Sequence, residues 1–328
     1  MWITSSPAKS LTPSAVALGN FDGVHRGHQR VIQPVLNFAG ASVHHYATVV
    51  TFDPHPQEFF TGQRRALLTP VNEKAQQLLR LGVEQLVLLP FDRELAALSP
   101  QQFVEKILVQ QLRSQRISVG EDFRFGKART GTAAELQAIA TTYGIPVTIV
   151  PLQTCEGERI SSSSIRQALQ QGDLQCANQL LGRPYTLLGS VVKGQQLGRT
   201  IGFPTANVQV PPEKFLPRQG VYAVRVFIQE GTQKTQEVKI PQWFSPEPEQ
   251  VLSDLLGVMN IGYRPTVNGT SPTVEVHLLN WCGDLYGKTI TVHLEKFLRP
   301  EQKFASLEAL KAQIQADCAI AKSFLSAE

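Results

Sequence analysis

The chain has 328 residues, of which 42% are hydrophobic and 18% are charged, and its formal net charge is +4 at pH 7. These values are typical of a globular protein with room for two cores, and they exclude a disordered or fibrous chain. No apolar run approaches the roughly 20 residues of a membrane span, and the N-terminus lacks a secretory pattern, so we expect a cytoplasmic protein. The mild positive charge suits anionic small ligands as well as nucleic acid. Four cysteines without a Cys-x-x-Cys pair are expected to be free thiols: Cys155, Cys176, Cys282 and Cys318.

Short apolar runs alternate with amphipathic helical patterns over the first 150 residues. This alternation is typical of an α/β fold with a doubly wound parallel sheet. Pro34 lies inside the first helical pattern, where we expect a bend or an early end at Gln33. Strands are predicted at residues 15–18, 42–52, 83–89, 117–119 and 147–150, and helices at 29–38, at 68–81, after Ser99-Pro100 and after Thr132.

The string Gly19-Asn-Phe-Asp-Gly-Val-His-Arg-Gly-His28 joins the first strand to the first helix. A parallel sheet presents backbone N–H groups and a positive helix end to phosphate at such a junction. His25 and His28 are expected on adjacent helical turns, where imidazoles donate hydrogen bonds to a triphosphate in its charge-rich transition state. A bare His-x-x-His pair more often represents ordinary polar residues at a helix start or two metal ligands. The glycines, Asp22 and the preceding strand favour phosphate chemistry.

Three further segments of this half are suited to the same chemistry. Prolines stop the second strand in Thr51-Phe-Asp-Pro-His-Pro56, so that Phe52 and His55 lie in a stiff loop. The string Gly120-Glu-Asp-Phe-Arg-Phe-Gly126 joins a strand end to a basic loop. In Arg159-Ile-Ser-Ser-Ser-Ser-Ile-Arg166, hydroxyls at a helix start lie between two arginines, which offers charge and donors to phosphates.

These strings together resemble a known family. The first is similar to the His-x-Gly-His signature of the nucleotidyltransferase superfamily, and its longer form resembles that of bacterial bifunctional riboflavin kinase/FAD synthetases. In the last string Ser163 stands where the family usually has threonine, and the hydroxyl is kept. The resemblance implies catalytic roles for His25 and His28 and a flavin-binding role for Phe52 and His55. It implies ATP binding by Gly19, Phe21, Asp22, Gly27, Asp122, Arg159, Ser162 and Arg166.

The pattern changes after a short helix at residues 174–181 and a linker at 182–185. Short β-patterned runs separated by glycine and proline turns, with no helical segment between them, are typical of an antiparallel barrel. An amphipathic helix at 306–325 is expected to close the barrel or to pack beside it. We therefore predict an adenylyltransferase domain at 1–182 and a kinase domain at 183–328. The β-patterned runs are residues 187–192, 221–228, 274–278 and 290–294.

The loop from Gly194 to Asn207 is the glycine-rich segment of the second domain. Gly194, Gly198 and Gly202 let backbone amides approach phosphate oxygens, and Thr205 and Asn207 offer the hard oxygen ligands that Mg²⁺ prefers. The string Gly-Phe-Pro-Thr-Ala-Asn resembles that of riboflavin kinases. That resemblance extends to three later strings and implies that Asn260 and Arg264 bind flavin and that Glu275 is the general base.

The resemblance implies that the barrel phosphorylates riboflavin with Mg-ATP and that the first domain joins FMN to AMP and releases pyrophosphate. Riboflavin, FMN and ATP are then the partners, without nucleic acid or a membrane. A phosphate monoester has its second pKa near about 6, so FMN arrives ionised and needs no base. The 5′-hydroxyl of riboflavin is a neutral alcohol and does need one, which suits Glu275.

Two other functions fit parts of the sequence. The first domain could serve another acceptor, such as a pantetheine or nicotinate phosphate, in which case the kinase loop has no purpose. The barrel could be a flavin-binding or regulatory module that contacts RNA, in which case Glu275 has no purpose. Residues 229–254 form a long insertion without a strong pattern, which we expect to be disordered or a lid.

Overall fold

The computed structural model describes residues 1–36, 38, 44–155, 157–194, 197–229, 252–266, 269–281 and 283–327. Within these residues the chain forms two compact units, one ending at Ser162 and the other beginning at Ser163. The helices α7 (Ser162–Gln171) and α8 (Leu174–Leu181) therefore group with the second unit, earlier than the predicted linker at 182–185. Cys282 and most of the predicted insertion, residues 230–251, lie outside the described residues.

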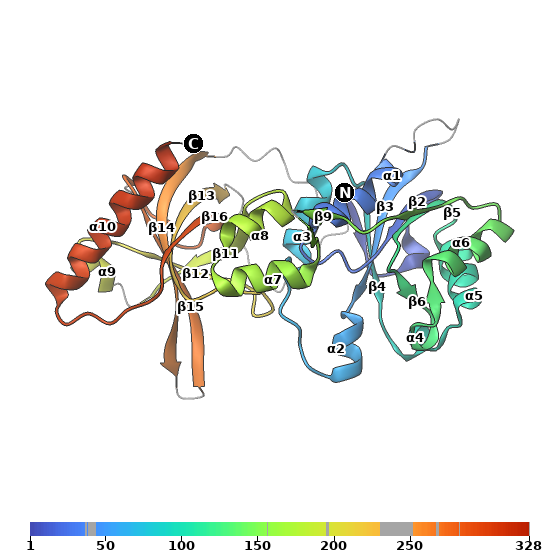
Figure 1. Cartoon of the computed structure of the whole chain (residues 1–328), viewed down its shortest axis with the longest axis horizontal. Coiled ribbons are helices and arrows are strands. Elements are labelled where there is room, and N and C mark those ends of the chain that lie inside the picture. Colours follow the sequence, from blue (N-terminus) through green and yellow to red (C-terminus); the bar gives the residue numbers. More distant parts are fainter. Residues whose placement is uncertain are drawn as a thin grey trace. The chain divides into compact units, whose positions relative to one another are not determined.

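The first unit is built on a six-stranded parallel sheet with the order β1-β4-β3-β2-β5-β8 (Figure 1). All five strand pairs are parallel, which confirms the predicted sheet. The three-residue first strand was not predicted, because it is too short to show a period. The strands are β1 (Trp2–Thr4), β2 (Ser14–Leu18), β3 (Tyr46–Asp53), β4 (Gln85–Pro90), β5 (Ser114–Gly120) and β8 (Val147–Val150).

Helices cover both faces of this sheet because side chains alternate along each strand. Val16 and Leu18 of β2 pack into one core and Ala15 and Ala17 into the other. The first core includes α5 (Pro100–Phe103), the π-helix Val104–Gln111 and α6 (Ala133–Thr142), and the second includes α1 (Arg26–Leu36) and α3 (Val71–Arg80). The other short elements are 3-10 turns at Pro7–Lys9 and Lys127–Arg129, α2 (Pro56–Thr61), α4 (Arg93–Ala97), and the hairpins β6 (Arg124–Phe125) with β7 (Gly131–Thr132) and β9 (Thr154–Cys155) with β10 (Glu158–Arg159).

Helix α1 continues through Pro34 to Leu36, so an early end at Gln33 is not found. Proline has no N–H to donate to the carbonyl four residues earlier, which costs the helix one hydrogen bond. Val31, Ile32 and Val35 are nevertheless buried against the sheet. We conclude that this packing holds the last turn in place.

The second unit is a closed antiparallel barrel with the order β11-β12-β15-β14-β13-β16, as predicted (Figure 1). A helix of four residues, α9 (Leu197–Thr200), interrupts the β-pattern, contrary to the expectation of no helix between the strands. The fold class, a parallel α/β sheet followed by an antiparallel barrel and a terminal helix, is confirmed. The strands are β11 (Tyr185–Val192), β12 (Ala206–Gln209), β13 (Gly220–Gln229), β14 (Leu252–Thr266), β15 (Gly269–Leu278) and β16 (Thr289–Arg299).

The terminal helix α10 (Leu307–Ser326) packs beside the barrel through Ala321 and Leu325. A buried ion pair ties this helix to the end of β16. Nε of Arg299 donates to Asp317 over 3.0 and 3.1 Å, and Nη2 donates over 2.8 Å. The Asp317 side chain is only 3% exposed, so its charge depends on this partner.

Replacing Asp317 by alanine is expected to lower the free energy of unfolding of the second unit by about 3 kcal/mol, because it leaves a mostly buried guanidinium without its carboxylate. Urea titration followed by circular dichroism measures this loss. The matched control is Asp254→Ala. Its partner Arg225 is about as buried as Arg299, but Asp254 itself is 46% exposed and accepts one bond, and Nη2 of Arg225 keeps its bond to the Leu325 carbonyl, so the loss should be about 1 kcal/mol or less. Equal losses in the two variants would contradict the role of burial.

Candidate active sites

The loop between β2 and α1 brings His25 and His28 together at the carboxyl edge of the parallel sheet. Their rings stack with centroids 3.5 Å apart and planes 15° apart. The backbone N–H of His28 donates to Nδ1 of His25 over 3.2 Å, which caps the start of α1. Because Nδ1 accepts this bond, a neutral His25 ring carries its proton on Nε2. That N–H is a donor suited to a phosphate oxygen.

The same loop contains three left-handed residues. Phe21 and Val24 have φ of 48° and 43°, and Gly23 has 92°. Non-glycine residues in this region cost about 1–3 kcal/mol each, and such residues often cluster at active sites. Gly19 and Gly27 allow close packing: a Cβ on Gly27 would lie 3.2 Å from the His25 ring, and one on Gly19 would lie 3.2 Å from the Phe21 ring. Both predicted nucleotide-site glycines therefore have a packing role as well.

Asp22 connects this loop to two distant segments. Its Oδ1 accepts from the backbone N–H of Thr69 over 3.1 Å, and the Thr69 hydroxyl accepts from the N–H of Gly23 over 2.9 Å. The hydroxyl of Ser162 donates to the Asp22 carbonyl over 2.8 Å. The structure thus brings Ser162 to residues 19–28, the segment that carries His25 and His28 (the histidine loop). The predicted role of Ser162 at the triphosphate stays a prediction.

Asp122 and Arg159, both predicted to bind ATP, form an ion pair with each other. Asp122 follows β5, and Arg159 lies in the β9–β10 hairpin. Each side chain is about half exposed, so the pair contributes little to stability. Arg166 lies one turn into α7 in the second unit, with its guanidinium 5.7 Å from the Phe215 ring centroid. Its predicted role at the triphosphate stays a prediction.

His55 caps the helix that follows β3. Its Nδ1 accepts from the backbone N–H of Gln57 over 3.1 Å, and the carboxylate of Glu58 accepts from the backbone N–H of His55 over 3.2 Å. Burial, assisted by the positive charges of Arg65 and Lys74, lowers the pKa of His55 to about 4. The ring is therefore neutral at physiological pH.

Four aromatic side chains gather beside His55 at the ends of β3 and β4. The rings of Phe52, Phe59 and Phe60 each lie within 6 Å of the Phe91 ring, at 5.6, 5.4 and 5.8 Å. Phe60 is 66% exposed. The sequence predicted only Phe52 among these residues, because Phe59, Phe60 and Phe91 meet only when α2 folds back on the sheet.

Lys74 is a buried lysine that the sequence analysis did not select. It lies in α3 with 6% of its surface exposed. Its Nζ donates to the carbonyl of Asn20 over 2.9 Å and to the hydroxyl of Thr51 over 3.4 Å. Burial lowers the pKa of Lys74, opposed by the negative charges of Asp22 and Asp53. Its spacing of four residues from the buried Leu78 was a signal, since it places a lysine on the core face of the helix.

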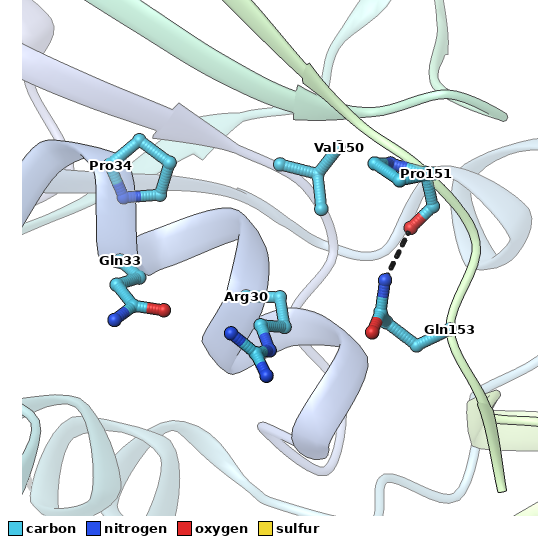
Figure 2. A pocket seen from close by; sticks show the side chains of 6 residues that line it. All are labelled: Arg30, Gln33, Pro34, Val150, Pro151 and Gln153. Carbon is cyan, nitrogen blue, oxygen red and sulfur yellow. Dashed lines mark hydrogen bonds between the residues drawn. The ribbon is translucent and has the colours of Figure 1, made fainter.

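A pocket of about 470 Å³ lies beside α1, the helix that follows the histidine loop in the sequence (Figure 2). Its other wall follows β8, where Gln153 donates to the carbonyl of Pro151 over 3.0 Å. The backbone of this wall is hydrogen-bonded to the two strings that contain the predicted ATP-binding residues Asp122 and Arg159. The N–H of Glu121 donates to the carbonyl of Val150, and the N–H of Ile160 donates to the carbonyl of Gln153, each over 2.9 Å. The lining residues are Arg30, Gln33, Pro34, Val150, Pro151 and Gln153.

In the second unit, three predicted residues form a row across neighbouring strands. Asn207 of β12 is paired with Glu275 of β15, which is paired with Asn260 of β14. Directly opposite residues point to the same face of an antiparallel sheet. The hydroxyl of Thr205 donates to Oε2 of Glu275 over 3.3 Å. Hydroxyl, amide and carboxylate oxygens therefore gather on one face of the barrel.

The glycine-rich loop folds against this row. A Cβ on Gly194 would collide with the amide of Asn207, and one on Gly198 would collide with the carbonyl of Phe203. Gly202 has φ of 90°, which favours glycine. These three glycines thus allow the loop to lie close to Thr205 and Asn207.

Glu301 joins the row and was not predicted. The amide of Asn260 donates to Oε1 of Glu301 over 3.2 Å. Glu301 follows β16, and no local pattern relates it to a residue 41 positions earlier. The side chain of Arg264, predicted to bind flavin, lies outside the described residues.

No group of three or more His, Cys, Asp or Glu side chains within the described residues is placed to hold a metal ion. No helix among them has both the length and the apolar character of a membrane span. Of the four cysteines, the three that the structure describes form no disulfide bond: Cys155, Cys176 and Cys318.

Comparison with known proteins identifies both halves of the chain. Residues 8–164 match the family model of FAD synthetase, and residues 181–325 match that of riboflavin kinase. The chain is 43% identical to the bifunctional riboflavin kinase/FMN adenylyltransferase of Escherichia coli K12, over 94% of this chain and 92% of that protein. It is 36% identical to the Bacillus subtilis protein of the same name, over 93% and 90%. A crystal structure described as a macrolide-efflux protein from Streptococcus pneumoniae is 30% identical, with a TM-score of 0.82 and 98% of both chains covered.

The order of the two matches along the chain agrees with the order of the two folds, a parallel sheet and then a barrel. The resemblance stated from the motifs is thereby confirmed. The chain belongs to the family of bifunctional riboflavin kinase/FMN adenylyltransferases, with the FAD synthetase domain first and the flavokinase domain second.

Proposed function

We propose that the two halves of this chain act in sequence, the barrel making FMN from riboflavin and the parallel-sheet unit making FAD from that FMN. One observation carries this assignment to specific residues: the two sites differ in their reactive groups. The first has stacked imidazoles, His25 and His28, and the second has a carboxylate, Glu275, bonded to the hydroxyl of Thr205. An ionised phosphate needs only donors, whereas an alcohol needs a base.

In the adenylyl site, a phosphate oxygen of FMN attacks the α-phosphorus of ATP. The new phosphorus–oxygen bond forms as the bond to the β-phosphate breaks, and pyrophosphate leaves. His25 and His28 donate to the phosphate oxygens as charge develops on them. Arg159 exchanges its exposed Asp122 partner for a triphosphate oxygen, which costs little because such pairs are worth about 0–1 kcal/mol. The backbone of Gly19 and Gly27, together with the hydroxyl of Ser162, completes the part of this site that the first unit supplies.

The pocket beside α1 provides space for the adenine base. Its wall is hydrogen-bonded to the strings that contain Asp122 and Arg159, through Glu121 and Ile160. Pro34, Val150 and Pro151 offer apolar surface to a planar ring, and the amides of Gln33 and Gln153 offer donors and acceptors to its edge (Figure 2). On the acceptor side, Phe52 and the exposed Phe60 offer aromatic surface to the isoalloxazine.

In the kinase site, Glu275 takes the proton of the riboflavin 5′-hydroxyl as that oxygen attacks the γ-phosphorus of ATP. ADP leaves as the bond to the β-phosphate oxygen breaks. Thr205 and Asn207 are oxygen donors of the kind that Mg²⁺ prefers, and the bound ion would neutralise phosphate charge. Asn260 and Arg264 would hold the flavin. These small substrates require no nucleic acid or membrane partner, and we expect the protein in the cytosol, where ATP is available.

His28→Ala is expected to lower FAD formation by about 10²–10³-fold while FMN formation continues, because one donor to the transition state is lost. Glu275→Gln is expected to lower FMN formation by about 10²–10⁴-fold while FAD still forms from supplied FMN, because only the base is lost. Chromatographic separation of FMN and FAD over time, with Mg-ATP and either riboflavin or FMN, measures both rates.

Each variant is the control for the other, since each keeps one activity of the same chain. If either substitution abolished both activities in a protein that still folds, the assignment of one reaction to each site would be wrong. If the unmodified chain forms no FAD but adenylylates another phosphate ester, the first unit serves a different acceptor.

The ring of His55 is expected to titrate near pH 4, because burial disfavours its charged form. A group with a lowered pKa stays neutral as the pH falls through 6.5, so His55 adds no positive charge to the flavin side above about pH 5. Two-dimensional NMR of the imidazole, assigned with His55→Asn, measures the midpoint. A midpoint near 6.5 would contradict the buried, neutral ring.

A further inference from the structure

The histidine loop contains two non-glycine residues with strained backbones, which surrounding contacts must hold in place. Phe21 and Val24 lie in left-handed backbone conformations, which persist only where surrounding contacts over-determine them. The carbonyl of Asn20, immediately before Phe21, accepts two hydrogen bonds. One comes from the hydroxyl of Thr51 over 2.9 Å and the other from Nζ of Lys74 over 2.9 Å.

Lys74 also bonds to Thr51, with 3.4 Å between Nζ and Oγ1. The three groups therefore form a closed triangle between the end of β2, the end of β3 and α3. Thr51 and Lys74 are 1% and 6% exposed, so water does not compete for these bonds. The loop to His25 and His28 begins on one side of this triangle, and the loop to Phe52 and His55 begins on the other.

We propose that Lys74 is a positioning residue of adenylyl transfer. It holds the Asn20 carbonyl and the Thr51 hydroxyl together, and so fixes the position of the loop that carries His25 and His28 relative to the loop that carries Phe52 and His55. This role rests on the proposed adenylyltransferase function of the first unit. Thr69, which lies just before the helix of Lys74, supports the same loop through its hydrogen bonds to Asp22 and Gly23.

The amine of Lys74 is suited to this role by its reach. Burial lowers its pKa, and the negative charges of Asp22 and Asp53 oppose this shift. Nζ has enough hydrogens to donate to both Asn20 and Thr51 whether or not it is protonated. A methionine in its place would keep most of the volume and remove the two hydrogen bonds.

The test uses the full chain with Lys74→Met. The kcat of FAD formation is expected to fall about 10–100-fold, because the reacting groups are misaligned in the transition state. The KM values for ATP and FMN should change less than about threefold, since the groups that bind them are still present. The rate of FMN formation from riboflavin should equal that of the unmodified chain.

A double-mutant cycle separates positioning from a general effect on stability. Lys74→Met and Thr51→Val both act on the Asn20 carbonyl, so the double variant should be about as slow as the slower single variant. The matched control is Thr48→Val, a buried threonine of the same strand whose hydroxyl donates to the carbonyl of Tyr46 and accepts from the amide of Gln85, and so loses hydrogen bonds away from Asn20. Combined with Lys74→Met, it should show only the independent product of the two effects.

An unchanged kcat for Lys74→Met overturns the inference, and FAD formation by the unmodified chain then leaves the proposed function standing. The inference is also overturned if the fall in kcat caused by Lys74→Met multiplies with that of Thr51→Val just as it does with that of Thr48→Val, and follows the loss in the free energy of unfolding. Lys74 would then have a purely structural role. If the unmodified chain forms no FAD, the proposed function and this inference are both wrong.

Discussion

The carbonyl of Asn20 is the point on which the first site depends. It lies two residues after the end of β2 at Leu18 and accepts hydrogen bonds from Thr51 and Lys74. The residues after it have left-handed backbones that cost about 1–3 kcal/mol each, and this cost must be offset by the surroundings. Thr69 and Ser162 supply further bonds to the same loop. The shape of the loop is thus imposed by four contacts from segments far away in the sequence, and not by the loop alone.

The two units show how the ionisation of the substrate decides which groups a site requires. The first site has imidazole donors and a half-exposed ion pair of Arg159 with Asp122, and its half-buried His55 is neutral at pH 7. The second has a carboxylate on a strand, with valines on either side of it buried in the barrel. The alternation of a β-strand places Glu275 opposite these valines, so the same pattern that builds the barrel also presents the base.

Much of the fold was predictable because its elements are periodic. The helix at 174–181 was predicted with the bounds that the structure shows, and the main strands of the parallel sheet after β1 were found within about four residues. Two barrel strands were not predicted: β12 lies inside the glycine-rich string, and β14 begins inside the predicted insertion and contains Gly257, Gly262 and Pro265. The exceptions have physical reasons. The strand Trp2–Thr4 is too short to show a period, and α9 has only four residues. The π-helix Val104–Gln111 shares its apolar positions with an α-helix, so the sequence does not distinguish the two.

The site residues divide in the same way. His25 and His28 belong to one contiguous string, and their rings stack. Thr205 and Glu275 lie 70 positions apart, but each belongs to its own string that resembles the family, and the structure brings the two together. Lys74 and Glu301 act across 54 and 41 positions, where no local string could relate them to Asn20 and Asn260. Lys74 still left a trace in the sequence, because a lysine at helical spacing from Leu78 must bury its charge with the core face. Burial of a charge is costly unless polar groups receive it. A lysine in such a position therefore predicts that its helix backs onto polar backbone, which in a parallel sheet is found at the carboxyl edge where ligands bind.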